Sequence, residues 1–315
     1  MTKTFHSCAS NLLNVILIFL LFTVFAHQVP AQNSEPLDRA PRRLKRVRAN
    51  GVDLHYVETG KGVPVILVHG GLDDYRMWEA QLEPFAERYH VIAYSRRYNY
   101  PNRNRYLRPD HSALIEAEDL AALIKKLKLG PTHVVGHSYG ALTALFLAVK
   151  HPELVRTVVL AEPPVLRWAE EKPEGRILFN TFMDTWRRVG DALRLGKREE
   201  ALRLTFNYFI GEGAFEQIPE AQRNYWMQNI REWQALTTSR DAFPILLRAD
   251  VRRMKVPALM LSGGRTLGIL KVVDAELEPL LAHGERVILA NATHDMWNEQ
   301  PEDCRRAVLA FLDKH

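Results

Sequence analysis

The sequence predicts an α/β protein with a mostly parallel β-sheet, helices on both faces of that sheet, and a helical insertion late in the domain. From Val63 onward, short apolar runs alternate with amphipathic helical stretches, an order that favours parallel strands joined by crossover helices. Between about residues 165 and 250 the alternation stops and helical stretches follow one another. The 315-residue chain is 47% apolar and 25% charged, which supports a large core and excludes disordered, collagen-like and coiled-coil proteins.

The first predicted element is a β-hairpin centred on Asn50-Gly51, a dipeptide that favours a two-residue turn. Residues 46–49 and 52–57 are its predicted strands. Arg46 and Arg48 alternate with other residues along the first strand, so we expect them on an exposed strand face rather than in a polyanion-binding site.

The remaining elements of the core follow as strand and helix in turn. Short apolar runs predict buried strands, and longer stretches with apolar residues three and four positions apart predict helices that cover the sheet. The predicted strands are 64–68, 90–94, 133–135, 155–161, 257–261 and 286–289, and the predicted helices are 77–89, 113–129, 139–150, 272–282 and 302–312, with 177–195 and 198–208 in the insertion.

The net charge of +5 alone would suggest a protein that binds nucleic acid or a membrane surface, but the excess charge is confined to one part of the chain. Residues 1–50 hold seven of the 42 Lys and Arg residues but only Glu35 and Asp38 of the 37 acidic ones. Residues 51–315 are therefore neutral, with 35 charges of each sign. We expect a small-molecule substrate and no nucleic-acid partner, and the sequence leaves the oligomeric state open.

The N-terminus has the pattern of a signal peptide. Lys3 precedes an apolar stretch over residues 12–26, and Val29-Pro30-Ala31 places small residues at the two positions that a signal peptidase recognises. We predict a signal peptide over residues 1–31 and an exported protein, periplasmic or secreted. The alternative is an uncleaved membrane anchor, for which this stretch is short of the roughly 20 residues that span a bilayer.

Residues 32–44 are rich in proline and charge and have no apolar period, which predicts a linker. The two cysteines are consistent with export. Cys8 lies in the predicted signal peptide, so the mature chain would keep Cys304 alone and form no intrachain disulfide. We expect Cys304 to be a packing residue of the last helix.

The motif that indicates chemistry is Gly136-His137-Ser138-Tyr139-Gly140, which has the pattern G-x-S-x-G between a predicted strand and a predicted helix. In that context a serine lies on a strained turn with its hydroxyl exposed, and the flanking glycines allow close backbone approach. The positive end of the following helix points toward any oxyanion that forms there. Ser138 is therefore a candidate nucleophile.

Three motifs in order make the chain resemble the α/β-hydrolase superfamily, over residues 45–315. Val68-His69-Gly70-Gly71 resembles the family's oxyanion loop, with Trp78 at the usual distance, and it precedes the serine motif. Ala292-Thr293-His294-Asp295-Met296 follows the last strand, where the family places its catalytic histidine. The insertion at about 165–250 corresponds to the family's cap domain.

The acidic member of the catalytic triad departs from the common family pattern. Most members have an aspartate after the strand that matches 257–261, but here Gly263-Gly264-Arg265-Thr266 ends in threonine, which supplies no negative charge. A minority place the acid after the preceding strand, where this chain has Glu162. The resemblance therefore implies Ser138, Glu162 and His294 as the triad, with Asp274 as the main competitor for the acid and an outward-facing Glu162 as the structural alternative.

The resemblance also implies a role for each residue. His294 would take the proton of Ser138, Glu162 would fix the imidazole tautomer, and the backbone N–H groups of Gly71 and Tyr139 would form the oxyanion hole. No cofactor and no metal ion is required. The remaining motif histidines, His69 and His137, are expected to be packing residues.

A serine nucleophile narrows the reaction. Dehalogenases and epoxide hydrolases of this fold attack alkyl carbon with a carboxylate, whereas a serine would form an ether that cannot be hydrolysed. Ser138 therefore favours acyl transfer, and the leading expectation is an exported serine hydrolase of the carboxylesterase type. The alternatives are a carbon–carbon bond hydrolase acting on a diketone and a receptor-like protein that binds a ligand in the same fold.

One segment has no functional explanation from sequence. Where many relatives have a glycine-rich loop after the strand 90–94, this chain has an Arg- and Tyr-rich loop over residues 95–108. The basic residues Arg103, Arg105 and Arg108 make an anion-binding patch one interpretation, but a structural loop is the preferred one.

Overall fold

The computed structural model describes residues 42–106 and 109–315. The predicted signal peptide, most of the predicted linker, Cys8 and Arg108 lie outside these residues. No helix in the described part of the chain has the length and apolar character needed to cross a membrane.

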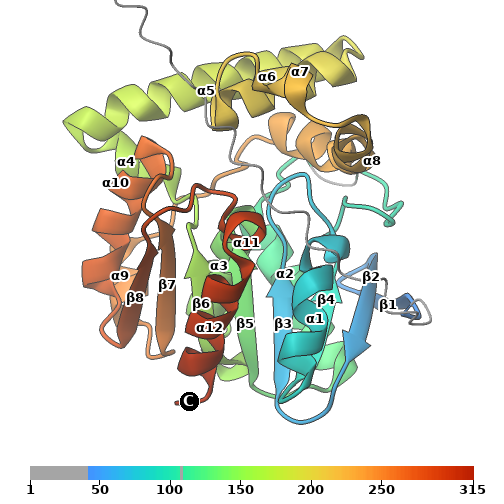
Figure 1. Ribbon diagram of the computed structural model, residues 1–315, viewed down its shortest axis with the longest axis vertical. Helices are drawn as coiled ribbons and strands as arrows, with labels where there is room; N and C mark the ends of the chain where they lie inside the picture. The colour runs from blue at the N-terminus through green and yellow to red at the C-terminus, as the bar shows by residue number, and fades with distance from the viewer. Residues whose placement is uncertain (1–41, 107–108) are drawn as a thin grey trace, which may run out of the picture. The chain divides into compact units, whose positions relative to one another are not determined.

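The core is a β-sheet whose described strands run in the order β1-β2-β4-β3-β5-β6-β7-β8 (Figure 1). β1 pairs antiparallel with β2 and β2 antiparallel with β4, whereas all other neighbours are parallel. The prediction of a mostly parallel sheet is confirmed. The strands are β1 (Lys45–Ala49), β2 (Val52–Thr59), β3 (Pro64–Val68), β4 (His90–Tyr94), β5 (Thr132–His137), β6 (Val155–Ala161), β7 (Ala258–Gly263) and β8 (Gly284–Leu289).

The hairpin between β1 and β2 forms at the predicted dipeptide. Asn50 and Gly51 have φ values of 45° and 76°, the left-handed conformation that this turn requires. Arg46 and Arg48 are exposed on β1, and each has a guanidinium nitrogen 3.6 Å from the Asp53 carboxylate. They lie on a solvated strand face, as expected.

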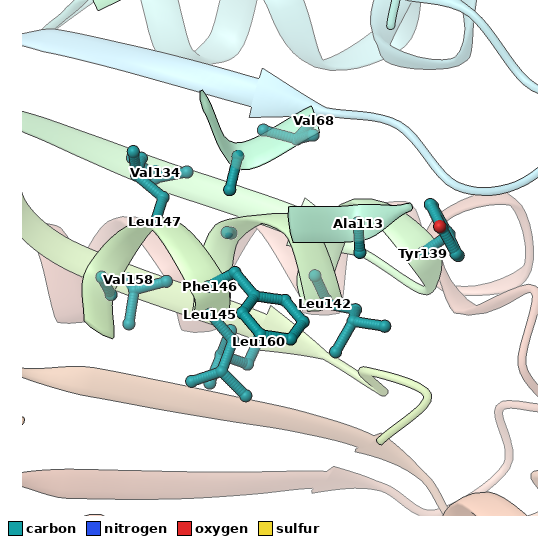
Figure 2. Close-up of a cluster of buried hydrophobic side chains, with 14 of the residues drawn as sticks. Val68, Ala113, Val134, Tyr139, Leu142, Leu145, Phe146, Leu147, Val158 and Leu160 are labelled. Carbon is teal, nitrogen blue, oxygen red and sulfur yellow. The ribbon is translucent and has the colours of Figure 1, made fainter. Parts of the chain in front are cut away.

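Alternate residues of the central strands are buried on opposite faces of the sheet, as the period of a strand requires. One face carries Val68, Val134, Val158 and Leu160, and helix α3 packs on it through Leu142, Leu145, Phe146 and Leu147 (Figure 2). The other face carries the intervening residues of the same strands and packs against the first and last helices. The helices of the first face are α2 (Ala113–Leu127), α3 (Tyr139–Lys150) and α10 (Gly268–Leu277), and those of the second face are α1 (Glu79–Ala86) and α12 (Pro301–Leu312).

Two predicted helices differ from the structure at their ends. The helix predicted over 77–89 consists of η1 (Tyr75–Trp78), capped by the side chain of Asp74, followed by α1. The helix predicted over 272–282 begins earlier, at Gly268, and ends in η3 (Glu278–Leu280), whose proline cannot continue the α-helical hydrogen bonds. Two short elements complete the sheet domain, η2 (Pro152–Leu154) and α11 (Met296–Glu299).

Between β6 and β7 the described chain forms helices joined by loops and contains no strand, as predicted for the insertion. Helices α5, α6, α7 and α8 form a layer beyond the ends of the strands (Figure 1). This layer has its own apolar cluster, which includes Phe215 and Trp233 and reaches down to Leu72 in the loop after β3. The helices are α4 (Leu166–Glu170), α5 (Pro173–Arg194), α6 (Arg198–Ile210), α7 (Ala214–Gln217), α8 (Glu220–Thr237) and α9 (Arg248–Arg253).

Candidate active site

Ser138 occupies a strained turn between β5 and α3. Its φ is 52° and its ψ is −122°, a conformation that costs free energy for a residue with a β-carbon and persists only where its surroundings enforce it. The backbone N–H of Ser138 donates to the carbonyl of Ala161 on β6 at 2.8 Å. A β-carbon on Gly140 would lie 2.3 Å from the carbonyl oxygen of His69, so the turn requires glycine there.

The structure brings the three predicted triad residues into one hydrogen-bonded chain. His294, in the loop after β8, has its Nε2 atom 2.9 Å from Oγ of Ser138. Its Nδ1 atom lies 2.5 Å from Oε2 of Glu162, which directly follows β6. Because the carboxylate accepts the Nδ1 proton, Nε2 is left to accept the hydroxyl proton of Ser138.

Glu162 is fully buried and held from two sides, so the outward-facing alternative is wrong. The Gly263 N–H donates to Oε1 at 2.6 Å, and the Thr266 hydroxyl donates to Oε2 at 2.8 Å. Thr266, the threonine of the Gly263-Gly264-Arg265-Thr266 segment, thus supports the Glu162 carboxylate. Sequence reasoning missed this role, although the threonine at that family position was the available signal.

Asp274, the competing acid, points elsewhere. Its Oδ2 atom accepts a hydrogen bond from the Ser262 hydroxyl at 2.5 Å and lies 3.6 Å from the Arg286 guanidinium. Burial raises the pKa of Asp274 to about 7, so it does not carry a full charge near neutral pH. The carboxylate that contacts His294 is that of Glu162.

His69 and His137 are structural groups of the loops, as expected. His69 donates from Nδ1 to the carbonyl of Gly70 at 2.8 Å and accepts the Arg96 N–H at Nε2. His137 Nε2 donates to the carbonyl of His294 at 2.9 Å, which holds the histidine loop against the serine turn. Burial and the neighbouring His294 lower the pKa of His137 to about 3, so its ring is neutral.

The two residues predicted for the oxyanion hole line the same cavity as Ser138. Tyr139 is the first residue of α3, so its N–H has no acceptor within the helix. Gly71 follows β3, and a β-carbon there would lie 3.5 Å from the indole of Trp233 on α8. The next N–H group, that of Leu72, already donates to Glu232 of α8 at 2.7 Å.

A cavity of about 670 Å³ opens at Ser138 and His294 between the sheet domain and the helical layer. Most of its wall is apolar or aromatic, and both layers contribute to it. Phe209 of α6 stacks over the His294 ring with ring centroids 5.8 Å apart. The aromatic residues of the wall are Tyr139, Phe182, Trp186, Phe206, Tyr208, Phe209, Tyr225, Trp226, Trp233 and Phe243.

The Arg- and Tyr-rich loop turns its first arginines inward. Arg96 is fully buried and forms ion pairs with Glu116 of α2 and Glu232 of α8. Arg97 is also buried and holds Asp119 through two hydrogen bonds of 2.7 and 2.6 Å. These two side chains bind carboxylates of the protein itself. Arg103 and Arg105 are exposed, so the structural interpretation of that part of the loop stays a prediction.

Comparison with known proteins decides the family. The model of the alpha/beta hydrolase fold matches residues 63–297, which is most of the chain. The protein is an α/β hydrolase. A relative from Metapseudomonas resinovorans named 2-hydroxy-6-oxo-6-(2'-aminophenyl)hexa-2,4-dienoic acid hydrolase is 34% identical, over 85% of this chain and 90% of that one.

More distant relatives share the fold of this α/β hydrolase but differ in reaction. The (E)-2-((N-methylformamido)methylene)succinate hydrolase of Acinetobacter baylyi is 24% identical over 84% of this chain and 96% of its own. A soluble epoxide hydrolase of a Corynebacterium species is 23% identical over 84% of this chain and 94% of its own. A solved thermophilic esterase from Thermogutta terrifontis superposes with a TM-score of 0.67 at 21% identity, covering 86% of this chain and 98% of that one.

Proposed function

We propose that the protein is a serine hydrolase that cleaves carboxylic esters through an acyl-enzyme on Ser138. The observation that carries the proposal is the hydrogen-bonded chain from Ser138 through His294 to Glu162 at the floor of the cavity. Hydrolase activity is common to the named relatives, and the serine and its substrate are our inference.

The geometry supports the following steps. His294 Nε2 takes the hydroxyl proton as Oγ of Ser138 attacks the carbonyl carbon, and the imidazolium is stabilised by Glu162. The resulting oxyanion is held by the N–H groups of Gly71 and Tyr139, each worth roughly 3–4 kcal/mol in known cases. His294 returns the proton to the leaving alcohol, and water activated by the same imidazole then hydrolyses the acyl-enzyme.

The nucleophile argues against the epoxide-hydrolase reaction of some relatives. Those reactions need a carboxylate nucleophile, because an alkyl–enzyme ester can be reopened at its carbonyl and an alkyl ether cannot. Ser138 stands at the turn where the nucleophile is expected, so the proposal is acyl transfer.

A carbon–carbon bond hydrolase acting on a diketone is the second candidate. The relative that is 34% identical supports it, because its name describes the hydrolysis of an oxo-dienoic acid. Parallel turnover of aryl esters and vinylogous diketones separates the two reactions. A receptor-like protein is the third candidate, and it predicts tight, stabilising ligand binding with negligible hydrolysis.

A fluorophosphonate activity probe tests the nucleophile. We expect covalent labelling and ester turnover in the wild type and neither in Ser138→Ala. Labelling that persists in Ser138→Ala, or its absence in a folded wild-type protein, would exclude the proposal. Glu162→Gln and Asp274→Asn form a matched pair for the acid: the first is expected to abolish turnover and the second to retain it, and the reverse order would reassign the acid to Asp274.

We also propose export, with cleavage after Ala31. N-terminal sequencing of the protein recovered from its native host tests this. A mature N-terminus at Gln32 is expected, whereas an intact N-terminus in a membrane fraction would favour the anchored alternative.

A further inference from the structure

Asp73 places an uncompensated carboxylate beside the candidate nucleophile. Its backbone carbonyl accepts a hydrogen bond from Asn99 Nδ2, but within the described residues its side chain has no hydrogen-bond or ion-pair partner. Asp73 Oδ2 and Ser138 Cβ both lie 3.4 Å from the point where a β-carbon on Gly70 would stand. The carboxylate therefore belongs to the part of the cavity where the reaction would occur.

The arginine in the wall of the cavity is already paired with a carboxylate of the protein. Arg76 is the one Lys or Arg among the described residues that line the cavity. Its guanidinium grips Asp74 through Nε–Oδ1 and Nη2–Oδ2 contacts of 2.8 and 2.6 Å and lies over the rings of Tyr100 and Tyr225. Asp74 is fully buried, so this ion pair is a fixed part of the cavity wall. The charge of Arg76 is therefore balanced by Asp74 and not by a substrate.

His137 also lines the cavity and supplies no cation at neutral pH. His137 is neutral, because burial and His294 lower its pKa to about 3. Asp295 adds a second carboxyl beside His294, although it already accepts a hydrogen bond from Asn298 Nδ2 at 2.7 Å. The reacting end of the cavity therefore has carboxyl groups in excess of free cations.

Burial raises the pKa of Asp73 well above its usual value, and the surrounding carboxylates raise it further. A substrate carboxylate would add to this repulsion, whereas a substrate cation would relieve it and favour the ionised form. Aromatic walls attract the same kind of group, because the face of an indole or phenol ring stabilises a quaternary ammonium. The charged groups that act on Asp73 are Asp74, Asp295, Glu232 and Arg96, and the Tyr225 hydroxyl interacts with it as well.

We propose that Asp73 is a specificity-determining residue: it makes the site prefer esters with a cationic group near the scissile carbonyl and reject esters with an anionic group there. This inference rests on the proposed ester hydrolysis. It concerns the charge of the substrate, which neither the triad nor the apolar wall determines.

Three esters of one acyl group test the preference, because they differ in charge and hardly in shape. They are the ester of choline, the ester in which carbon replaces the choline nitrogen, and the ester in which a carboxylate replaces one methyl group of that carbon analogue. We expect kcat/KM in the order cationic, neutral, anionic, with about tenfold or more per step, as one charge–charge contact in a partly buried site provides. Each ester is assayed over a range of pH, because burial raises the pKa of Asp73 and the preference requires its ionised form.

Variants of Asp73 assign the effect. In Asp73→Asn the ratio of cationic to anionic turnover is expected to fall about 100-fold, because both the attraction and the repulsion are lost. Asp73→Glu is expected to restore much of the ratio. Asp303→Asn, which removes an exposed carboxylate of α12 outside the cavity, is the matched control and should leave the ratio as in the wild type.

Binding separates failure of this inference from failure of the proposed function. The corresponding three amides bind without turnover, and quenching of the cavity tryptophans, Trp186, Trp226 and Trp233, reports their affinity. If no fluorophosphonate labels the protein but the amides bind in the order cationic, neutral, anionic, the reaction is wrong and the charge preference stands. Equal binding of cationic and anionic amides, or the same order in Asp73→Asn, would overturn the inference.

Discussion

Replacing Arg96 with methionine is expected to remove a large share of the protein's stability. The guanidinium is fully buried between Glu116 and Glu232, and it also donates to the carbonyls of His69 and Gly70 at 3.1 and 2.9 Å. Methionine fills similar space but leaves two buried carboxylates without their cation. Breaking a buried pair in this way costs about 3–5 kcal/mol, out of a total of roughly 5–15 kcal/mol for a typical domain.

Urea unfolding followed by tryptophan fluorescence measures the loss. Arg88→Met is the matched control, because Arg88 pairs with Asp313 at the surface and is half exposed. Such a pair is worth about 0–1 kcal/mol. A loss for Arg96→Met no larger than that for Arg88→Met would refute the claim that the buried network stabilises the fold.

The pH dependence gives a second check on the same network. Burial alone would raise the pKa of Glu116, but the charge of Arg96 and the close approach of His111, whose Nε2 lies 3.1 Å from Oε1, lower it to about 2. In the wild type this group therefore adds stability at neutral pH that is lost as the pH falls below its ordinary value of 4.5 toward about 2. Without Arg96, burial raises the pKa of Glu116 and of Glu232, so ionisation destabilises the variant. The penalty of Arg96→Met is thus expected to shrink as the pH is lowered, and a constant penalty would contradict the mechanism.

Three further outcomes follow from local contacts. Gly70→Ala is expected to reduce turnover at least about tenfold, while the variant still folds. Its β-carbon would lie 2.9 Å from His137 Nδ1 and 3.4 Å from Ser138 Cβ, so the side chains beside the nucleophile would have to shift. Steady-state kinetics measures the loss. Thr266→Val should lower kcat and cost about 1 kcal/mol in urea unfolding, because Glu162 loses a hydrogen bond. Cys304 should react with a thiol reagent only on unfolding, since burial raises its pKa to about 12.

The sequence was sufficient for most strands, because each consists of apolar residues that alternate between the two faces of the sheet. The ranges 64–68, 90–94 and 155–161 match β3, β4 and β6. The serine turn was also predictable, since its glycines are required by backbone contacts that the motif itself implies. Such signals come from residues that are close together along the chain, so a single sequence is enough to detect them.

What the sequence did not predict depends on partners that are distant along the chain. Arg96 meets Glu232 across 136 positions, so nothing near Arg96 indicates that its charge is buried rather than exposed. The proposed role of Asp73 likewise depends on the pairing of Arg76 with Asp74, which the sequence alone does not show. The cap residues could not be divided into core and cavity wall, because both sets are apolar and occur on the same amphipathic helices.

The position of the acid follows from the sheet topology and allows one more prediction. β6 and β7 are parallel neighbours with Ala161 opposite Leu261, so residues just beyond either strand reach the same point. Thr266 and His294 accordingly contact the same oxygen of Glu162. An aspartate at position 266 would therefore bring a carboxylate close to the imidazole from the neighbouring strand.

This predicts that Thr266→Asp partly rescues Glu162→Gln. The single Glu162→Gln change removes the acceptor that fixes the imidazole tautomer, a loss of up to about 10⁴-fold in kcat for comparable triads. Adding Thr266→Asp is expected to recover at least about tenfold of that loss, whereas Thr266→Asp in the wild type should lower activity, because it places a second carboxylate against Glu162. Ester kinetics on the four proteins, with folding checked by circular dichroism, measures both effects. A folded double variant no more active than Glu162→Gln would mean that the point beside His294 can be reached only from β6.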